Sequence, residues 1–153
     1  MNLQTVTERY RPTIGIECHV QLKTKTKLFS GADNDARDKA PNTTVSPICF
    51  GFPGVLPVLN DEAITLAVRA GLALNAELPE ISRFERKHYF YPDLPKGYQI
   101  TQLAEPVIVG GYVDVPQLDG NTLKVRIHHA HLEEDAGKLT HPTNGTESFV
   151  DLN

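Results

Sequence analysis

One segment of this 153-residue chain has the pattern of a helix, and the residues before it exclude another long one. Residues 30–60 contain seven prolines and glycines, which interrupt helices and favour turns. From Asp61 to Asn75 apolar residues recur at helical spacing, Asn60 can serve as the N-cap, and two acidic residues suit the positive end of the helix dipole. We therefore predict a helix over 61–75 and an irregular segment over 30–60, whose apolar run 48–56 should pack against the domain.

Most of the remaining sequence has the two-residue period of β-strands. Residues 13–22 alternate apolar and polar side chains, 107–115 are rich in β-branched residues, and alternation returns after Asn121. Asp119-Gly120 and Asn144-Gly145 are typical hairpin turns. These patterns predict an α+β fold with an antiparallel meander and one helix.

Length, charge and cysteine content limit the class of protein. A chain of 153 residues forms one domain with a core, and a net charge of -4 gives no general nucleic-acid signature. The sequence has no apolar run long enough to span a membrane, and residues 1–11 have no secretory signal. Two cysteines without a repeated spacing indicate a reducing compartment, so we predict a cytoplasmic protein.

Two segments carry candidate metal ligands. Residues 128–138 contain three histidines, three adjacent carboxylates and a lysine, and in the strand over 13–22 Glu17 and His19 would share one face. Carboxylates from both segments with one imidazole would form an oxygen-rich site that suits Mg²⁺ or Mn²⁺. The alternative for the acidic residues is a solvated turn. Strand parity places Glu133 and Glu134 on opposite faces, and the sequence does not decide which one would bind the ion.

Residues 83–99 combine cations, aromatic side chains, prolines and a glycine. Rigid backbone at the prolines could hold Lys87 and Lys96 toward a polyphosphate, while tyrosines stack on a base or a ribose. A buried aromatic corner with a basic rim explains the same composition equally well. No glycine-rich loop of Rossmann or P-loop type is present, so a nucleotide site here would be of another kind.

Three segments together, residues 14–22, 87–100 and 131–138, resemble the B subunits of the aspartyl/glutamyl-tRNA amidotransferases. The resemblance covers about residues 14–153. It implies a fold like those of glutamine synthetase and the guanidino kinases, a mostly antiparallel sheet flanked by helices, with residues 1–153 as the N-terminal part of a catalytic cradle domain. The helical and tail domains of that family are absent from this sequence, so we expect the chain to be part of a longer protein and to be inactive alone.

The resemblance also implies a reaction. The side-chain carboxylate of Glu-tRNA(Gln) or Asp-tRNA(Asn) would be phosphorylated by ATP, and ammonia from a glutaminase partner would then displace the phosphate. The implied cofactors are ATP and Mg²⁺, and the implied partners are the A-type glutaminase subunit and the small C-type subunit of a heterotrimer. The preference between the two mischarged tRNAs stays open.

Site residues follow from the resemblance position by position. The implied metal-binding set is Glu17, His19 and Glu134, with Glu133 and Asp151 as further candidates. Lys87 and Lys96 would face the phosphates of ATP, and Tyr89 and Tyr91 of the same segment are the tyrosines expected to contact its base or ribose. The implied catalytic residues are Glu17, His19, Glu134 and Lys87. Zinc, which some members bind through two cysteines that flank a proline, is not expected, because Cys49 alone cannot form such a site.

Two other functions remain as alternatives. In the first, this part of the protein is a cradle that binds tRNA and docks the partner subunits, and its metal is structural. In the second, it is a stand-alone metal hydrolase, which we rank last.

Overall fold

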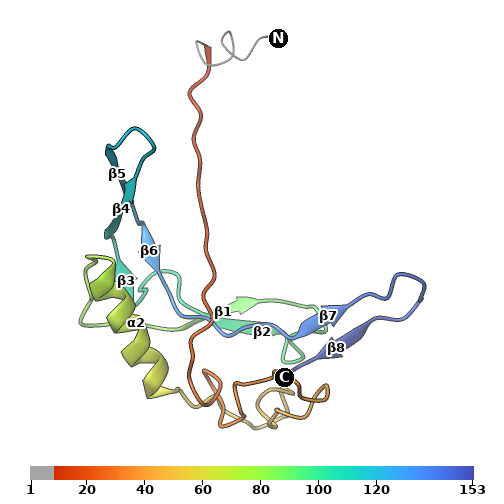
Figure 1. Cartoon of the computed structure of the whole chain (residues 1–153). Coiled ribbons are helices and arrows are strands. Elements are labelled where there is room, and N and C mark those ends of the chain that lie inside the picture. The colour runs from red at the N-terminus through yellow and green to blue at the C-terminus, as the bar shows by residue number, and fades with distance from the viewer. Residues whose placement is uncertain (1–8) are drawn as a thin grey trace.

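The computed structural model describes residues 9–153. Residues 1–8 lie outside the described part. They make up most of the 1–11 segment for which the sequence predicted no secretory signal. Within that part, helix α2 (Asp61–Ala73) lies at one side of the molecule and short antiparallel strand pairs make up the rest (Figure 1). The α+β prediction is therefore confirmed in its coarse form. The single predicted helix is confirmed, but the described strands form four separate antiparallel pairs and not one continuous sheet.

Helix α2 follows the predicted pattern. The side chain of Asn60 accepts a hydrogen bond from the backbone N–H of Glu62 at 2.9 Å, which confirms the predicted N-cap. The buried face of the helix consists of Ala63, Ala67 and Gly71. A Cβ atom at Gly71 would lie 3.1 Å from Cγ1 of Ile108, so the absence of a side chain lets the helix pack closely on the next layer.

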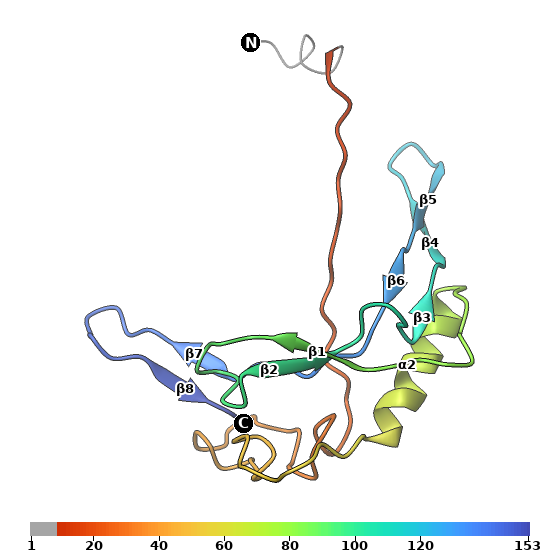
Figure 2. The same cartoon turned by 180° about the vertical axis from the view of Figure 1, so that it is seen from behind.

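Four antiparallel pairs account for the strands. They are β1 (Glu85–His88) with β2 (Tyr98–Thr101), β3 (Ile108–Val109) with β6 (His129–Ala130), β4 (Tyr112–Pro116) with β5 (Thr122–Arg126), and β7 (Lys138–Thr140) with β8 (Phe149–Asp151). Both predicted turns lie in hairpin connections. Asp119-Gly120 lies in the turn between β4 and β5, and Asn144-Gly145 lies in the longer 141–148 loop between β7 and β8, where the N–H of Gly145 donates to the carbonyl oxygen of Pro142. Seen from either side, β1 and β2 lie between α2 and the β7–β8 hairpin (Figure 2).

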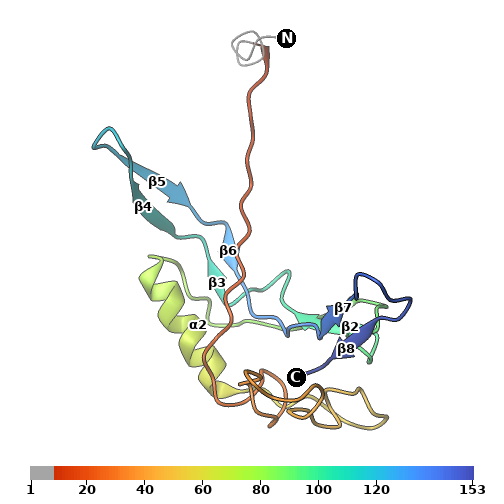
Figure 3. The same ribbon diagram turned by 45° about the vertical axis from the view of Figure 1, so that its right-hand side comes forward.

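The predicted strand over 107–115 is divided in two. Gly110 and Gly111 have φ angles of +65° and +102°, which end β3 and start β4 in a new direction. The N–H of Tyr112 donates to the carbonyl oxygen of Leu74 at 2.8 Å, so the bend is attached to the end of the helix. The β4–β5 hairpin consequently projects away from the helix and the β1–β2 pair (Figure 3).

The prediction of a half-buried strand over 13–22 is wrong. These residues form a single extended segment that joins no strand pair in the described structure and projects on the same side as β4–β5 (Figures 1 and 3). Its apolar side chains Ile14, Ile16 and Val20 are 79–83% exposed. Alternation gives a segment two faces, but only a neighbouring strand converts them into a buried face and an exposed face.

A small hydrophobic core packs helix α2 against β3 and the 131–132 segment. Its buried members are Ala67, Val107, Ile108 and Leu132. Gln102, which is 3% exposed, accepts hydrogen bonds from the N–H groups of Val107 and Leu132 through Oε1. Its Nε2 atom donates to Ser82 Oγ. One buried amide therefore connects the end of β2 with residues 131–132.

The apolar run 48–56 packs only in part. Ile48 and Val55 are half-buried, whereas Phe50 and Phe52 are exposed and stack on each other with ring centroids 5.6 Å apart. Leu56, at the end of the run, is 76% exposed. The prediction that the whole run packs against the domain is therefore wrong for the two phenylalanines and for Leu56.

Candidate functional site

The neighbouring carboxylates Glu133 and Glu134 contact different partners. Ile100 lies opposite Arg86 in the β1–β2 pair. The backbone N–H and C=O groups of Ile100 point away from β1 and bond to Glu134. The Ile100 N–H donates to Glu134 Oε1 at 2.6 Å, and the N–H of Glu134 donates to the Ile100 carbonyl oxygen at 3.1 Å. Glu133 instead accepts a hydrogen bond from Thr101 Oγ1 at 3.3 Å. This arrangement agrees with the strand parity expected from the sequence.

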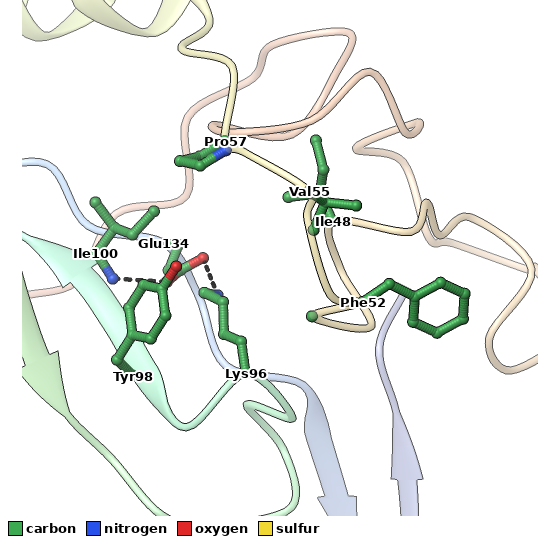
Figure 4. Close-up of a pocket in the computed structure, with 9 residues that line it drawn as sticks. Ile48, Phe52, Val55, Pro57, Lys96, Tyr98, Ile100 and Glu134 are labelled. Atoms are coloured by element: carbon green, nitrogen blue, oxygen red, sulfur yellow. Dashed lines mark hydrogen bonds and ion pairs between the residues drawn. The ribbon is translucent and has the colours of Figure 1, made fainter.

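Glu134 forms a largely buried ion pair with Lys96. The Nζ atom of Lys96 lies 2.6 Å from Glu134 Oε2, and the two side chains are 10% and 15% exposed. The pair lies across a pocket of about 180 Å³ from the 48–57 loop. Figure 4 shows Lys96 and Glu134 beside Tyr98, facing Ile48 and Val55. Lys96 is thus neutralised by a carboxylate, and the structure does not bring Glu134 together with Glu17 and His19.

Glu133 lies with the other predicted ligands. Its Oε1 atom is 3.7 Å from His19 Nδ1, and His19 Nε2 is 3.3 Å from Glu17 Oε1. His131 Nε2 lies 3.3 Å from Glu133 Oε2 on the other side. Three of the five predicted metal ligands, Glu17, His19 and Glu133, are therefore neighbours.

The donor set of this cluster fits a hard cation. Carboxylate oxygens of Glu17 and Glu133 with one imidazole are ligands that suit Mg²⁺ or Mn²⁺, and no thiolate takes part. At present His19 itself lies between the two carboxylates. Within residues 9–153, no three histidine, cysteine, aspartate or glutamate side chains are placed to hold one ion together.

Lys87 lies on the face of β1–β2 that Glu133 contacts. Cross-strand neighbours share a face, so Lys87 and its partner Gln99 lie on the same side as Glu85 and its partner Thr101. Thr101 in turn donates to Glu133. Lys87 is exposed, and it forms no ion pair with any residue in the described range. It is therefore a cation that a phosphate group could reach.

Tyr89 and Tyr91 follow the end of β1 at His88, where the N–H of Tyr89 still donates to the carbonyl oxygen of Gly97 at 3.1 Å and Tyr91 lies in a bend. Their ring centroids are 5.2 Å apart. Tyr91 is 65% exposed, whereas Tyr89 is half-buried and donates from its hydroxyl to Asp93 Oδ2 at 3.0 Å. This hydrogen bond and burial raise the pKa of Tyr89.

Asp151, the fifth predicted metal ligand, lies elsewhere. Its Oδ1 atom accepts hydrogen bonds from the N–H groups of Asn42 at 2.9 Å and Asn153 at 3.0 Å. The first of these bonds is the main cause of the lowered pKa of Asp151. The carboxylate connects the 40–44 loop to the end of β8 and makes no contact with Glu17 or Glu133.

Sequence reasoning missed three residues that shape this site. Gln102 fixes residues 131–132, Thr101 binds Glu133, and Asp93 binds Tyr89. Asp93 lies inside the aromatic and basic segment, but nothing in a single sequence distinguishes its buried carboxylate from an exposed turn residue.

The described part of the chain contains no helix that is long and apolar enough to span a membrane.

Comparisons with known proteins agree with the resemblance in the sequence. The model of the GatB/GatE catalytic domain matches residues 12–153. The B subunit of the aspartyl/glutamyl-tRNA(Asn/Gln) amidotransferase of Mycolicibacterium smegmatis is 54% identical over 141 residues, covering 92% of this chain and 28% of that protein. The corresponding proteins of Cellvibrio japonicus and Thermotoga petrophila are 56% and 52% identical, covering 95% of this chain in both cases. The chain spans less than a third of the length of these relatives, at 28–31%.

Proposed function

Since this chain belongs to the GatB/GatE catalytic domain family, we propose that it forms part of the kinase and amide-transfer centre of a tRNA-dependent amidotransferase. The centre phosphorylates the side-chain carboxylate of Glu-tRNA(Gln) or Asp-tRNA(Asn) with ATP, and ammonia then replaces the phosphate. The observation that carries this proposal is the gathering of Glu17, His19 and Glu133 on the side of β1–β2 where Lys87 has no ion-pair partner among residues 9–153.

Charge arrangement supports a phosphoryl-transfer reaction. A carboxylate oxygen of the aminoacyl group attacks the γ-phosphorus, ADP leaves, and the acyl phosphate formed is then attacked at carbon by ammonia with release of phosphate. Such transfers depend mainly on positioning and on compensation of negative charge. Lys87 supplies a positive charge that no carboxylate of the described residues neutralises. When bound, Mg²⁺ would offset the charge of the ATP phosphates, and Glu17, His19 and Glu133 would hold it.

Each side chain has a separate task in this proposal. Glu17, His19 and Glu133 would bind the cation, and Lys87 contacts the transferred phosphoryl group. Tyr89 and Tyr91 contact the nucleotide. Glu134 and Lys96, which the resemblance also assigns to the site, act on the other side of β2, where they bind each other.

The proposed reaction requires partner subunits. The named relatives are the B subunits of amidotransferases, and each of them extends well beyond the part that matches this chain. We propose that an A-type glutaminase subunit supplies the ammonia, that a small C-type subunit completes the assembly, and that the assembly works in the cytoplasm.

Replacement of Glu133 by glutamine tests this function. In the complete assembly, with ammonium salt in place of glutamine, we expect tRNA-dependent ATP hydrolysis to fall about 100-fold, because the amide is a weak ligand for a hard cation. The control is Asp135→Asn, the exposed third member of the acidic triplet, which should leave the rate unchanged. Unchanged ATP hydrolysis in both variants, together with weaker tRNA binding, would instead favour a docking cradle with a structural metal.

A further inference from the structure

The carboxylate of Asp93 is buried, and only one of its two oxygens accepts a hydrogen bond from the described residues. Asp93 is 8% exposed, and its Oδ2 atom accepts the hydrogen bond from the Tyr89 hydroxyl at 3.0 Å. Its Oδ1 atom has no hydrogen-bond partner within residues 9–153. A buried carboxylate oxygen without a partner is unfavourable, so the hydrogen bond to Tyr89 is the side-chain contact through which Asp93 acts among the described residues.

The backbone holds Asp93 in a fixed place. Its carbonyl oxygen accepts a hydrogen bond from the N–H of Gly137 at 2.8 Å, which joins the β1–β2 loop to the start of β7. The N–H of Tyr89 donates to the carbonyl oxygen of Gly97 at 3.1 Å, so both ends of the loop are paired. The loop therefore carries Asp93 as a rigid support for the Tyr89 side chain.

The hydrogen bond decides what Tyr89 can bind. A phenol has one O–H donor and oxygen lone pairs that accept. Because Asp93 takes the donor, the free lone pairs of the Tyr89 oxygen can only accept a hydrogen bond from a ligand. Phosphate oxygens at neutral pH mostly accept as well, so they are poor partners for this oxygen. Ribose hydroxyls and base amino groups donate, so they are suitable partners.

We propose that Asp93 is a positioning residue, which holds the Tyr89 hydroxyl so that its oxygen accepts a hydrogen bond from a hydroxyl or amino group of a bound nucleotide. This inference rests on the proposed function, because it places the nucleotide beside Lys87. The same donor chemistry occurs in ATP and in the 3′-terminal nucleotide of the tRNA. The raised pKa of Tyr89 agrees with a phenol that stays protonated beside a carboxylate.

The test is a double-mutant cycle between Asp93→Leu and Tyr89→Phe in the complete assembly, with KM and kcat measured for ATP and for the mischarged tRNA. We expect Asp93→Leu to raise one KM about tenfold, the cost of one hydrogen bond, with kcat nearly unchanged. A rise in the KM for ATP identifies ATP as the ligand, and a rise for tRNA identifies the tRNA end. In the Tyr89→Phe background, the same replacement should add no further loss. Asp93→Asn keeps an acceptor oxygen and should restore most of the affinity.

Several outcomes would overturn the proposal. An equal rise in KM in both backgrounds shows that Asp93 acts through the loop and not through Tyr89, and an unchanged KM shows that it has no positioning role. If Asp93→Leu does not fold, Asp93→Asn replaces it in the cycle, with an expected rise of about threefold that Tyr89→Phe abolishes. The matched control is Asp114→Leu with Tyr112→Phe on the projecting hairpin, which should change neither KM. Failure of the proposed function is distinct, because Lys87→Met would then leave tRNA-dependent ATP hydrolysis unchanged.

Discussion

Replacement of Glu134 by alanine is expected to lower the free energy of unfolding of this domain by about 3–5 kcal/mol. The change leaves the Lys96 ammonium group, whose side chain is 10% exposed, without its carboxylate partner in a pocket lined by apolar side chains. It also removes the acceptor of the Ile100 N–H. Hydrogen exchange of the buried Val107 and Leu132 amides, whose acceptor Gln102 is unchanged, measured in the full-length protein over a denaturant series, gives the free energy of opening.

The matched control for this prediction is the neighbouring residue. Glu133→Ala removes a more exposed carboxylate, with 27% of the side chain accessible, and should cost about 1 kcal/mol or less. The double replacement of Lys96 by methionine and Glu134 by leucine should recover most of the stability, because no charge is then buried unpaired. Equal losses for Glu133→Ala and Glu134→Ala would show that the ion pair does not stabilise the domain.

Replacement of Lys87 by methionine is expected to lower tRNA-dependent ATP hydrolysis by about 10³-fold. Removal of one group that compensates charge in a transition state typically costs 10²–10³, and cations at a transferred phosphoryl group contribute as much or more. Methionine keeps the length of the side chain but not the charge. Stability should change little, since Lys87 is exposed and forms no ion pair within residues 9–153.

Steady-state hydrolysis of ATP by the complete assembly, with each mischarged tRNA in turn, measures this effect. Lys138→Met, a replacement of an exposed lysine on β7, is the control and should retain the rate. A loss of less than tenfold for Lys87→Met would mean that another cation contacts the phosphoryl group.

Local patterns in the sequence predicted the local structure well. The helix over 61–73 and its Asn60 cap depend on residues within a few positions of each other, and so do the two hairpin turns. Strand parity is equally local, and it correctly separated Glu133 from Glu134. It could not identify which side each residue faces, because that depends on the packing of residues 131–137 against β2.

Long-range partners could not be read from the sequence. The sequence around Lys96 predicted a cation available to a polyphosphate. Only the fold shows that the carboxylate of Glu134, 38 positions later, lies beside it. The alternation in residues 13–22 predicted two faces, but no strand in the described structure lies beside them to bury one. The carboxylate of Asp151 could in principle bind a metal ion, but its Oδ1 atom accepts a hydrogen bond from the N–H of Asn42 in the 40–44 loop.

The measurement that most directly tests the kinase centre uses Glu17→Gln in the complete assembly. Ammonium salt replaces glutamine as nitrogen donor, tRNA-dependent ATP hydrolysis is the readout, and glutamine hydrolysis is followed separately. Glu17 is exposed and contacts His19, so the replacement should leave the fold intact. We predict that ATP hydrolysis falls about 100-fold while glutamine is still cleaved at the normal rate. If both activities persist, the cluster of Glu17, His19 and Glu133 is structural, and the kinase centre lies elsewhere.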